Sequence, residues 1–169
     1  GAGGLGSPAT FYLAAAGVGT IGLMDGDTVD LSNLQRQILH TTASVGTNKT
    51  ASARARLEAL DPSIRIEPYA FRLSAENAPE MLAPYDFVID ATDNFDSKFL
   101  IARACHEAAK PYSHAGIRNF HGQTMTVIPG KTACYRCLFH EDGAPVATTP
   151  QGPIGALPGV IGSIQAIEA

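Results

Sequence analysis

The sequence lacks the features of three special classes of protein. It has no run of like charges and a net charge of only -4, so it offers no basic patch to nucleic acid. No apolar stretch approaches the roughly 20 residues of a membrane-spanning helix. It has only three cysteines, of which Cys134 and Cys137 form a C-x-x-C pair. We therefore expect no nucleic-acid or membrane partner, and thiol or metal chemistry in the reducing cytoplasm.

What remains has the composition of a globular domain. The chain has 169 residues, of which 45% are hydrophobic and 17% are charged. This is enough for one domain with a sizeable core. Strand-like and helix-like segments alternate as far as Pro111, which is typical of a parallel sheet with right-handed crossovers. The expected fold class is α/β, a Rossmann-like doubly wound, mainly parallel sheet with late antiparallel strands.

The elements expected from the pattern can be given by residue range. Helices are expected from the N-cap candidate Ser7 to Gly17, over 48–62, 74–85 and 97–110, and from 160 onward. Strands are expected over 20–25, 64–71, 86–93, 112–117 and 122–130. Residues 137–159 are rich in proline and glycine, which predicts a long irregular loop.

The first six residues, GAGGLG, have the G-x-G-x-x-G spacing of a nucleotide-binding turn. A helix follows at once, and its N-terminus offers unpaired N–H groups to phosphate. Asp25 ends the next strand about 20 residues on, where a ribose-binding carboxylate is expected. Alone, this pattern also fits a NAD(P)-dependent oxidoreductase, or a flexible glycine-rich start with no ligand.

Two cations and an acid favour phosphate chemistry. Arg36 lies in the segment SNLQRQ, and Lys49 begins a helix, where the helix dipole disfavours a cation unless an anion is near. Nucleotidyl transfer needs cations because negative charge spreads over phosphate oxygens in its transition state. Asp93 follows the carboxyl end of a strand, where doubly wound sheets bind ligands. It is either a helix N-cap or a ligand of Mg²⁺.

The late part of the chain holds further candidate residues. Cys134 and Cys137 supply two of the four ligands of a structural zinc site. His140 is a candidate third ligand, no fourth is evident, and a redox pair or two inert thiols are the alternatives. His114 and His121 lie in or beside the late strands. We assign them no role, because lone histidines more often pack than react.

Taken in order, these segments resemble one family over the whole chain. GAGGLGSP, DGDTVDLSNLQRQ, Lys49, ATDN, CYRCL and GVIGSIQAIEA are similar to the ThiF/MoeB/HesA adenylyltransferases, the bacterial relatives of ubiquitin-activating enzymes. The combination of SNLQRQ with CYRC is highly specific. The resemblance implies that residues 1–169 are the core of an ATP-binding adenylation domain, without the family's first strand and its C-terminal part.

The resemblance also implies an activity. Family members use Mg-ATP to adenylate the C-terminal Gly-Gly carboxylate of a ubiquitin-like sulfur-carrier protein, in thiamine-type or molybdopterin-type sulfur transfer. The carboxylate attacks the α-phosphate and pyrophosphate leaves. No general base is needed, because the carboxylate is already ionised at pH 7. Family members are typically homodimers, and we expect this chain to be one.

Roles for individual residues follow by position in the motifs. The implied nucleotide contacts are Gly3, Gly4, Gly6, Asp25, Ser32, Asn33, Arg36, Lys49, Asp93 and Asn94. Among them Arg36, Lys49 and Asp93 would be catalytic: the two cations neutralise charge in the transition state and Asp93 holds Mg²⁺. Cys134 and Cys137 would form half of a four-cysteine Zn²⁺ site.

One position departs from the family pattern. Many members have a cysteine in a crossover loop, four residues before a glycine. Counting back from Gly152 reaches Thr148, and threonine cannot form the thioester or acyl-disulfide of a cysteine. We therefore predict adenylation without a covalent enzyme intermediate. A module that binds the carrier without catalysis remains an alternative.

Overall fold

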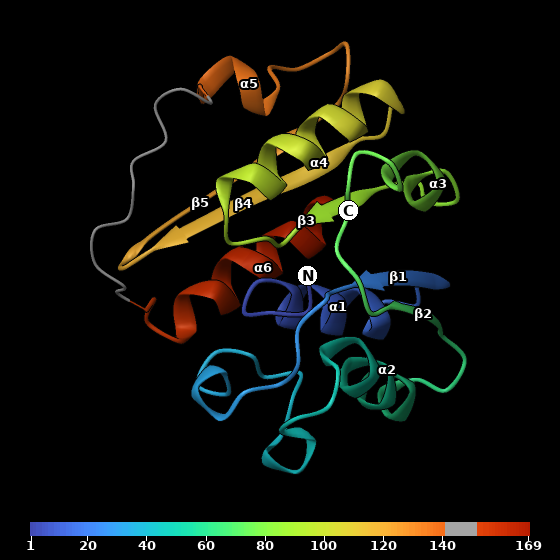
Figure 1. The fold of residues 1–169 in the computed structure, drawn as a ribbon, viewed down its shortest axis with the longest axis vertical. Coiled ribbons are helices and arrows are strands. Elements are labelled where there is room, and N and C mark those ends of the chain that lie inside the picture. The colour runs from blue at the N-terminus through green and yellow to red at the C-terminus, as the bar shows by residue number, and fades with distance from the viewer. Residues whose placement is uncertain (141–151) are drawn as a thin grey trace.

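A computed structural model describes residues 1–140 and 152–169 of the chain (Figure 1). The helices are α1 (Gly6–Ala15), α2 (Lys49–Leu60), α3 (Ala78–Leu82), α4 (Phe95–Glu107), α5 (Tyr135–Leu138) and α6 (Ala156–Glu168), with single 3₁₀ turns η1 (Leu31–Asn33) and η2 (Thr42–Ser44). The strands are β1 (Thr20–Met24), β2 (Arg65–Tyr69), β3 (Val88–Asp90), β4 (Tyr112–Arg118) and β5 (His121–Val127). No helix in the described part of the chain is long and apolar enough to cross a membrane. Thr148 lies outside the described residues.

The strands form two hydrogen-bonded sheets. Strands β1 and β2 pair in parallel, and so do β3 and β4. Strand β5 pairs antiparallel with β4, from Tyr112 opposite Val127 to Arg118 opposite His121. The predicted α/β class with a late antiparallel strand is confirmed. Among the described residues no strand joins β1 to β3, and residues of both strands line a cavity of about 1530 Å³ between the sheets.

Helices cover both faces of the β3–β4–β5 sheet (Figure 1). Tyr112 and Ala115 are three residues apart in β4 and therefore face opposite sides. Tyr112 lies in a buried cluster with Phe99 and Cys105 of α4, whereas Ala115 packs with Ile161 of α6. The second sheet buries its apolar residues against α1 and α2. The result is the layered, doubly wound arrangement that the alternating pattern predicts.

Helix α1 begins two residues earlier than the sequence suggests. Leu5 occupies the N-cap position and Ser7 lies within the first turn, so the expectation of Ser7 as the cap is wrong. The Ser7 hydroxyl is buried without a hydrogen-bond partner among the described residues. The helix begins early because the glycine loop is tight: a Cβ on Gly6 would overlap the carbonyl oxygen of Gly1. At the other end Gly17 has φ +74°, the left-handed conformation that ends a helix.

Three other helices also differ from their expected ranges. Helix α3 is shorter, because the Asn77 side chain accepts a 2.8 Å hydrogen bond from the Ser74 backbone and makes a turn there. Helix α5 lies around the C-x-x-C pair, where a loop was expected, and its four residues are too few to show periodicity. Helix α6 begins at Ala156 instead of 160, since Pro158 is tolerated in a first turn.

Helix α6 touches the two loops that carry predicted site residues. A Cβ on Gly162 would overlap the carbonyl oxygen of Leu5, and a Cβ on Gly155 would overlap that of Gln35. Further along α6, the side-chain amide of Gln165 donates to the backbone carbonyls of Asp90 and Ser113, each at 3.0 Å. The helix therefore packs directly against the glycine loop and the turn before Arg36, and it ties the ends of β3 and β4 together.

Candidate active site

The glycine loop is fixed to the end of β1 by side-chain hydrogen bonds. Asp25 accepts the N–H of Ala2 at 2.8 Å and that of Asp27 at 2.9 Å, one on each carboxylate oxygen. His40 contacts the carbonyl of Ala2 and the hydroxyl of Ser52, each at 2.9 Å. Burial lowers the pKa of His40. Each oxygen of Asp25 can accept a second hydrogen bond, so the carboxylate remains available to ribose hydroxyls.

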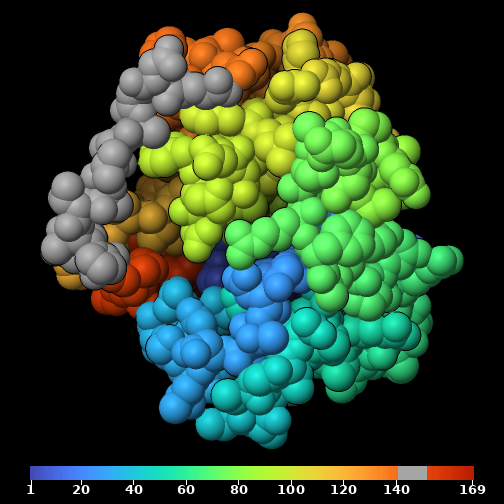
Figure 2. All heavy atoms as spheres, in the orientation of Figure 1, coloured from blue at the N-terminus to red at the C-terminus, as the bar shows by residue number. Residues whose placement is uncertain are grey.

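A polar cavity of about 500 Å³ opens next to the end of β1. Its lining residues come from three distant segments: Gly26, Asp27, Thr28, Asn33, Arg36, Gln37, Lys49 and Asp93. The three residues predicted to be catalytic, Arg36, Lys49 and Asp93, thus share one cavity. Figure 2 shows the dark blue N-terminal residues recessed between light blue, yellow-green and red parts of the surface. The arrangement places two cations and two carboxylates around one cavity.

Arg36 is held in place on both sides. Its Nη2 donates to Oδ1 of Asn33 at 2.9 Å. Its aliphatic part lies against Gly4, where an added Cβ would come within 3.3 Å of the Arg36 Cγ and 3.2 Å of the Pro158 Cβ. The glycine therefore leaves space for the arginine, and a Cβ in its place would require Arg36 or Pro158 to shift by a few tenths of an ångström.

Lys49 is the first residue of α2, and its side chain is largely buried. Its ammonium group contacts Oδ2 of Asp27 at 3.3 Å, and Arg72 contacts the other oxygen of that carboxylate at 2.8 Å. Burial alone would raise the pKa of Asp27, but the hydrogen bonds from Arg72 and Lys49 outweigh burial and lower it. Sequence reasoning missed Asp27 and Arg72, and the only signal for Asp27 was the second acid of the segment DGD.

Asp93 lies in the turn between β3 and α4 and lines both cavities. The helix cap is its neighbour Asn94, whose Oδ1 accepts the N–H of Ser97 at 2.9 Å. The only hydrogen bond described for the Asp93 carboxylate comes from Asn94, at a long 3.4 Å. Because Asn94 takes the capping role, Asp93 remains available to a cation.

The remaining predicted contacts are placed unevenly. Gly3, Gly4 and Gly6 line the larger cavity, as do Asp25 and Asn94. Ser32 lines neither cavity. Its hydroxyl donates instead to Oδ1 of Asp30 at 2.5 Å, and its backbone N–H donates to the same oxygen at 2.8 Å, which is the bond that caps η1.

The two cysteines of the C-x-x-C pair lie at the start and within α5. Their sulfur atoms are 3.4 Å apart, close to the roughly 3.8 Å between two thiolates on one tetrahedral zinc. Burial alone would raise the pKa of Cys134, but hydrogen bonds from Cys137 and nearby backbone N–H groups lower it. Among the described residues no three His, Cys, Asp or Glu side chains gather, so His140 does not complete a group of three here. The pair itself fits half of a zinc site.

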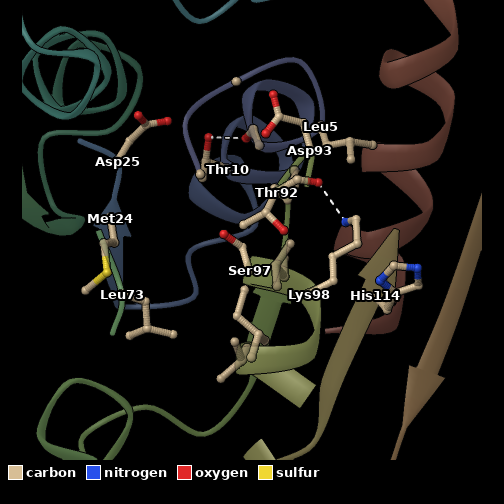
Figure 3. Close-up of a pocket in the computed structure, with 18 of the residues that line it drawn as sticks. Leu5, Thr10, Met24, Asp25, Leu73, Thr92, Asp93, Ser97, Lys98 and His114 are labelled. Atoms are coloured by element: carbon tan, nitrogen blue, oxygen red, sulfur yellow. Dashed lines mark hydrogen bonds between the residues drawn. The ribbon is translucent and has the colours of Figure 1, made fainter. Parts of the chain in front are cut away.

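A second polar cluster, which sequence reasoning missed, lies buried between β3, β4 and α4 (Figure 3). Asp90 accepts hydrogen bonds from His114 at 2.8 Å and from Lys98 at 3.3 Å. Lys98 also donates to the backbone carbonyls of Thr92 at 2.7 Å and Ala115 at 2.6 Å. These bonds fix the turn that carries Asp93. No sequence motif marks the cluster, because Asp90 and His114 are 24 residues apart along the chain.

The fold is that of an α/β domain with cavities at the carboxyl ends of its parallel strands, where doubly wound folds bind ligands. The ThiF family model matches residues 1–169 of the chain. The chain therefore belongs to the ThiF family.

Named relatives of known sequence agree with this assignment. The chain is 45% identical to the sulfur carrier protein adenylyltransferase of Thermus thermophilus, over 100% of this chain and 65% of that protein. It is 45% identical to the SAMP-activating enzyme E1 of Haloferax volcanii, with 63% of that enzyme covered. It is also 45% identical to the adenylyltransferase and sulfurtransferase MOCS3 of Anopheles gambiae, with 39% covered. The chain thus spans less than two thirds of the length of these relatives.

Solved structures share the fold. The structure of E. coli MccB with ATP matches 99% of this chain and 52% of the MccB chain, with a TM-score of 0.83 and 26% identity. The structure of selenomethionine PaaA matches 99% of this chain with a TM-score of 0.82 at 24% identity, which is a likeness of fold alone.

Proposed function

We propose that this protein is an ATP-dependent adenylyltransferase that activates the C-terminal Gly-Gly carboxylate of a ubiquitin-like sulfur-carrier protein and releases pyrophosphate. The convergence of Arg36, Lys49 and Asp93 on one cavity carries the proposal. A carboxylate that approaches a triphosphate brings one anion to another, and fixed cations lower the energy of that approach. The names of the relatives favour this reaction over hydride transfer.

Different residues of the site would contact different parts of the nucleotide. Asp25 would accept the ribose hydroxyls, and the backbone of Gly3, Gly4 and Gly6 would lie along the phosphates at the start of α1. Asn33 orients Arg36, which with Lys49 would neutralise the charge that develops on the phosphates. The carrier carboxylate needs no base, because it is already ionised.

A magnesium ion fits the donor set of this cavity. Magnesium is bound in proteins by one or two carboxylates together with phosphate oxygens, and Asp93 is a carboxylate with a single long hydrogen bond at the wall of the phosphate cavity. We propose that Asp93 holds the ion, with Asn94 beside it. When bound, Mg²⁺ would neutralise phosphate charge and keep the leaving pyrophosphate in place.

Other parts of the proposal concern features away from the phosphates. We propose that Cys134 and Cys137 bind Zn²⁺ together with two further ligands, that the protein acts as a homodimer in the cytoplasm, and that the reaction passes through no thioester. The 3.4 Å separation of the two sulfur atoms supports the zinc site.

The test is exchange of labelled pyrophosphate into ATP that depends on an added Gly-Gly carrier. We expect replacement of either Arg36 or Lys49 by alanine to lower the exchange rate by about 100-fold, the usual cost of one stabilising group in a transition state. Lys110→Ala, which removes a hydrogen bond to the carbonyl of Ala83 away from both cavities, is the matched control and should leave the rate unchanged. Persistent exchange in the double variant Arg36→Ala/Lys49→Ala would rule out the proposal.

A further inference from the structure

One nitrogen of a buried histidine is left without a partner beside the candidate active site. His114 is 2% exposed, and its Nδ1 contacts Oδ2 of Asp90 at 2.8 Å. Its Nε2 is buried and has no hydrogen-bond partner among the described residues. Buried polar atoms in folded proteins nearly always have a partner, because an unmet one costs free energy. A group from outside the described residues is therefore needed to satisfy it.

His114 lines the larger cavity and does not line the smaller one. A Cβ built on Gly116, which lines the larger cavity, would be 3.8 Å from Nε2 of His114. His114 is absent from the lining of the smaller cavity that holds Arg36 and Lys49. In Figure 3 it lies beyond Lys98 on the side away from Asp25. Arg36, Lys49 and Asp93 line both cavities, so His114 lies in the part of the larger cavity that is away from Asp25 but continuous with the phosphate site.

The neighbours of His114 decide whether Nε2 donates or accepts. Burial alone would raise the pKa of Asp90, but the hydrogen bond from His114 and the charge of Lys98 outweigh it and lower the pKa. An ionised carboxylate only accepts, so Nδ1 of His114 carries the proton, and in the uncharged ring Nε2 is an acceptor. The missing partner must be a donor.

We propose that Nε2 of His114 accepts the N–H of one of the two C-terminal glycines of the carrier and so positions its carboxylate toward the phosphate site of Arg36 and Lys49. This inference rests on the proposed function. A glycine N–H is a donor with no side chain beside it, and Gly116 likewise has no side chain next to Nε2. Two backbones without Cβ atoms can come close enough for a direct hydrogen bond. His114 is in this sense a positioning residue.

The first test compares two Michaelis constants in the pyrophosphate exchange assay. In His114→Asn the amide stands near the place of Nδ1 and keeps the bond to Asp90, but no atom stands at Nε2. We expect the KM for the carrier to rise about five- to tenfold, the cost of one hydrogen bond, while the KM for ATP changes less than about twofold. The control is His106→Asn on the exposed side of α4, which should change neither constant. An unchanged KM for the carrier, or a parallel rise in both, overturns the inference.

The second test leaves the enzyme intact and changes the carrier. N-methylglycine at the last or the next-to-last position removes one backbone N–H. We expect one of these two carriers to show a KM raised about fivefold with the unaltered enzyme, and no further rise with His114→Asn. Equal effects in both enzymes, or no effect in either, overturn the inference even if the His114 variant folds poorly.

Failure of the proposed function can be told apart from failure of this inference. If no carrier supports exchange with the unaltered protein, the proposed function fails. A synthetic peptide that ends in Gly-Gly then still tests His114 directly, through the ¹⁵N resonance of its Nε2. A shift of that resonance on peptide addition supports the inference, and its absence overturns it.

Discussion

Two lysines are buried to nearly the same extent but in different surroundings. The side chain of Lys49 is 8% exposed and that of Lys98 is 7% exposed. Lys98 uses all three of its N–H groups, on Asp90 and on two backbone carbonyls. Lys49 has one described side-chain contact, at 3.3 Å to a carboxylate that is half exposed. An ammonium group has three donors. The donors of Lys98 are therefore all used within the fold, whereas Lys49 has donors left for a ligand. Burial alone does not distinguish a structural cation from a binding one.

The largest expected effect comes from the same substitution at the two lysines. Lys98→Met leaves Asp90 as an unpaired buried charge and two carbonyls without a donor, so we expect a loss of about 3–5 kcal/mol in the free energy of unfolding. Lys49→Met removes a contact to a half-exposed carboxylate, and we expect a loss of about 1 kcal/mol or less. Urea unfolding of both variants measures the difference, and calorimetry with Mg-ATP should show that only Lys49→Met loses nucleotide affinity while still folded. Similar stability losses in the two variants would contradict the distinction between Lys98 as a structural cation and Lys49 as a binding one.

A change of pH is expected to have an intermediate effect on stability, and it should affect the regions around the two lysines at different pH values. His40 holds the glycine loop in the region of Lys49, and its folded pKa lies below the unfolded value of about 6.5. The unfolded chain therefore binds more protons in this window, and stability falls as pH drops from about 6.5 toward the folded pKa. The contribution of Asp90, whose pKa is also lowered, is present above about 3.9 and is lost only as pH falls further.

The measurement is the urea midpoint between pH 7.5 and 5. We expect a decline in the unaltered protein and a flatter profile in His40→Gln, which keeps polar contacts but does not titrate. A decline of the same size in the variant would show that the loss belongs to another group.

The smallest expected effect is that of Asp27→Asn. The carboxylate pairs with Lys49 and Arg72 and is half exposed, so its loss should change the unfolding free energy by about 1 kcal/mol or less. The same change removes a negative charge from the phosphate cavity and frees Lys49, so we expect the Kd for ATP to fall about two- to fivefold at low salt. Weaker binding would show that Asp27 is itself needed by the ligand.

The two regions also differ in how far the sequence could describe them. Arg36, Lys49 and Asp93 lie in local motifs, and parallel strands with short turns bring such motifs to one edge of the sheet. The buried cluster depends on register: Asp90 stands opposite His114 only because β3 and β4 pair as they do. No local pattern encodes that pairing. The role of His114 was therefore out of reach until the neighbour of each strand was known.

Errors in local structure have similar causes. Ser7 has the side chain of a good cap, but the closeness of Gly6 to Gly1 decides where α1 begins. Asp93 and Asn94 are both acceptable caps, and the sequence could not say which of them takes the role. At both helix starts, local propensities alone did not identify the residue that takes the N-cap position.

Gly155, the N-cap of α6, and Gly162 within the helix have a consequence for surveys of mutational tolerance. Gly155 and Gly162 touch no predicted ligand, yet each lies against a backbone carbonyl of a loop that carries site residues. Any side chain at either position would move the helix away from Gln35 or Leu5, and with it the loops on which Arg36 and the first glycines stand. Saturation mutagenesis with an activity screen would score both as sensitive as a catalytic residue. Their intolerance would reflect the distance between two backbones. An abundance screen run in parallel would separate them from Lys49, whose loss we expect to leave the fold intact.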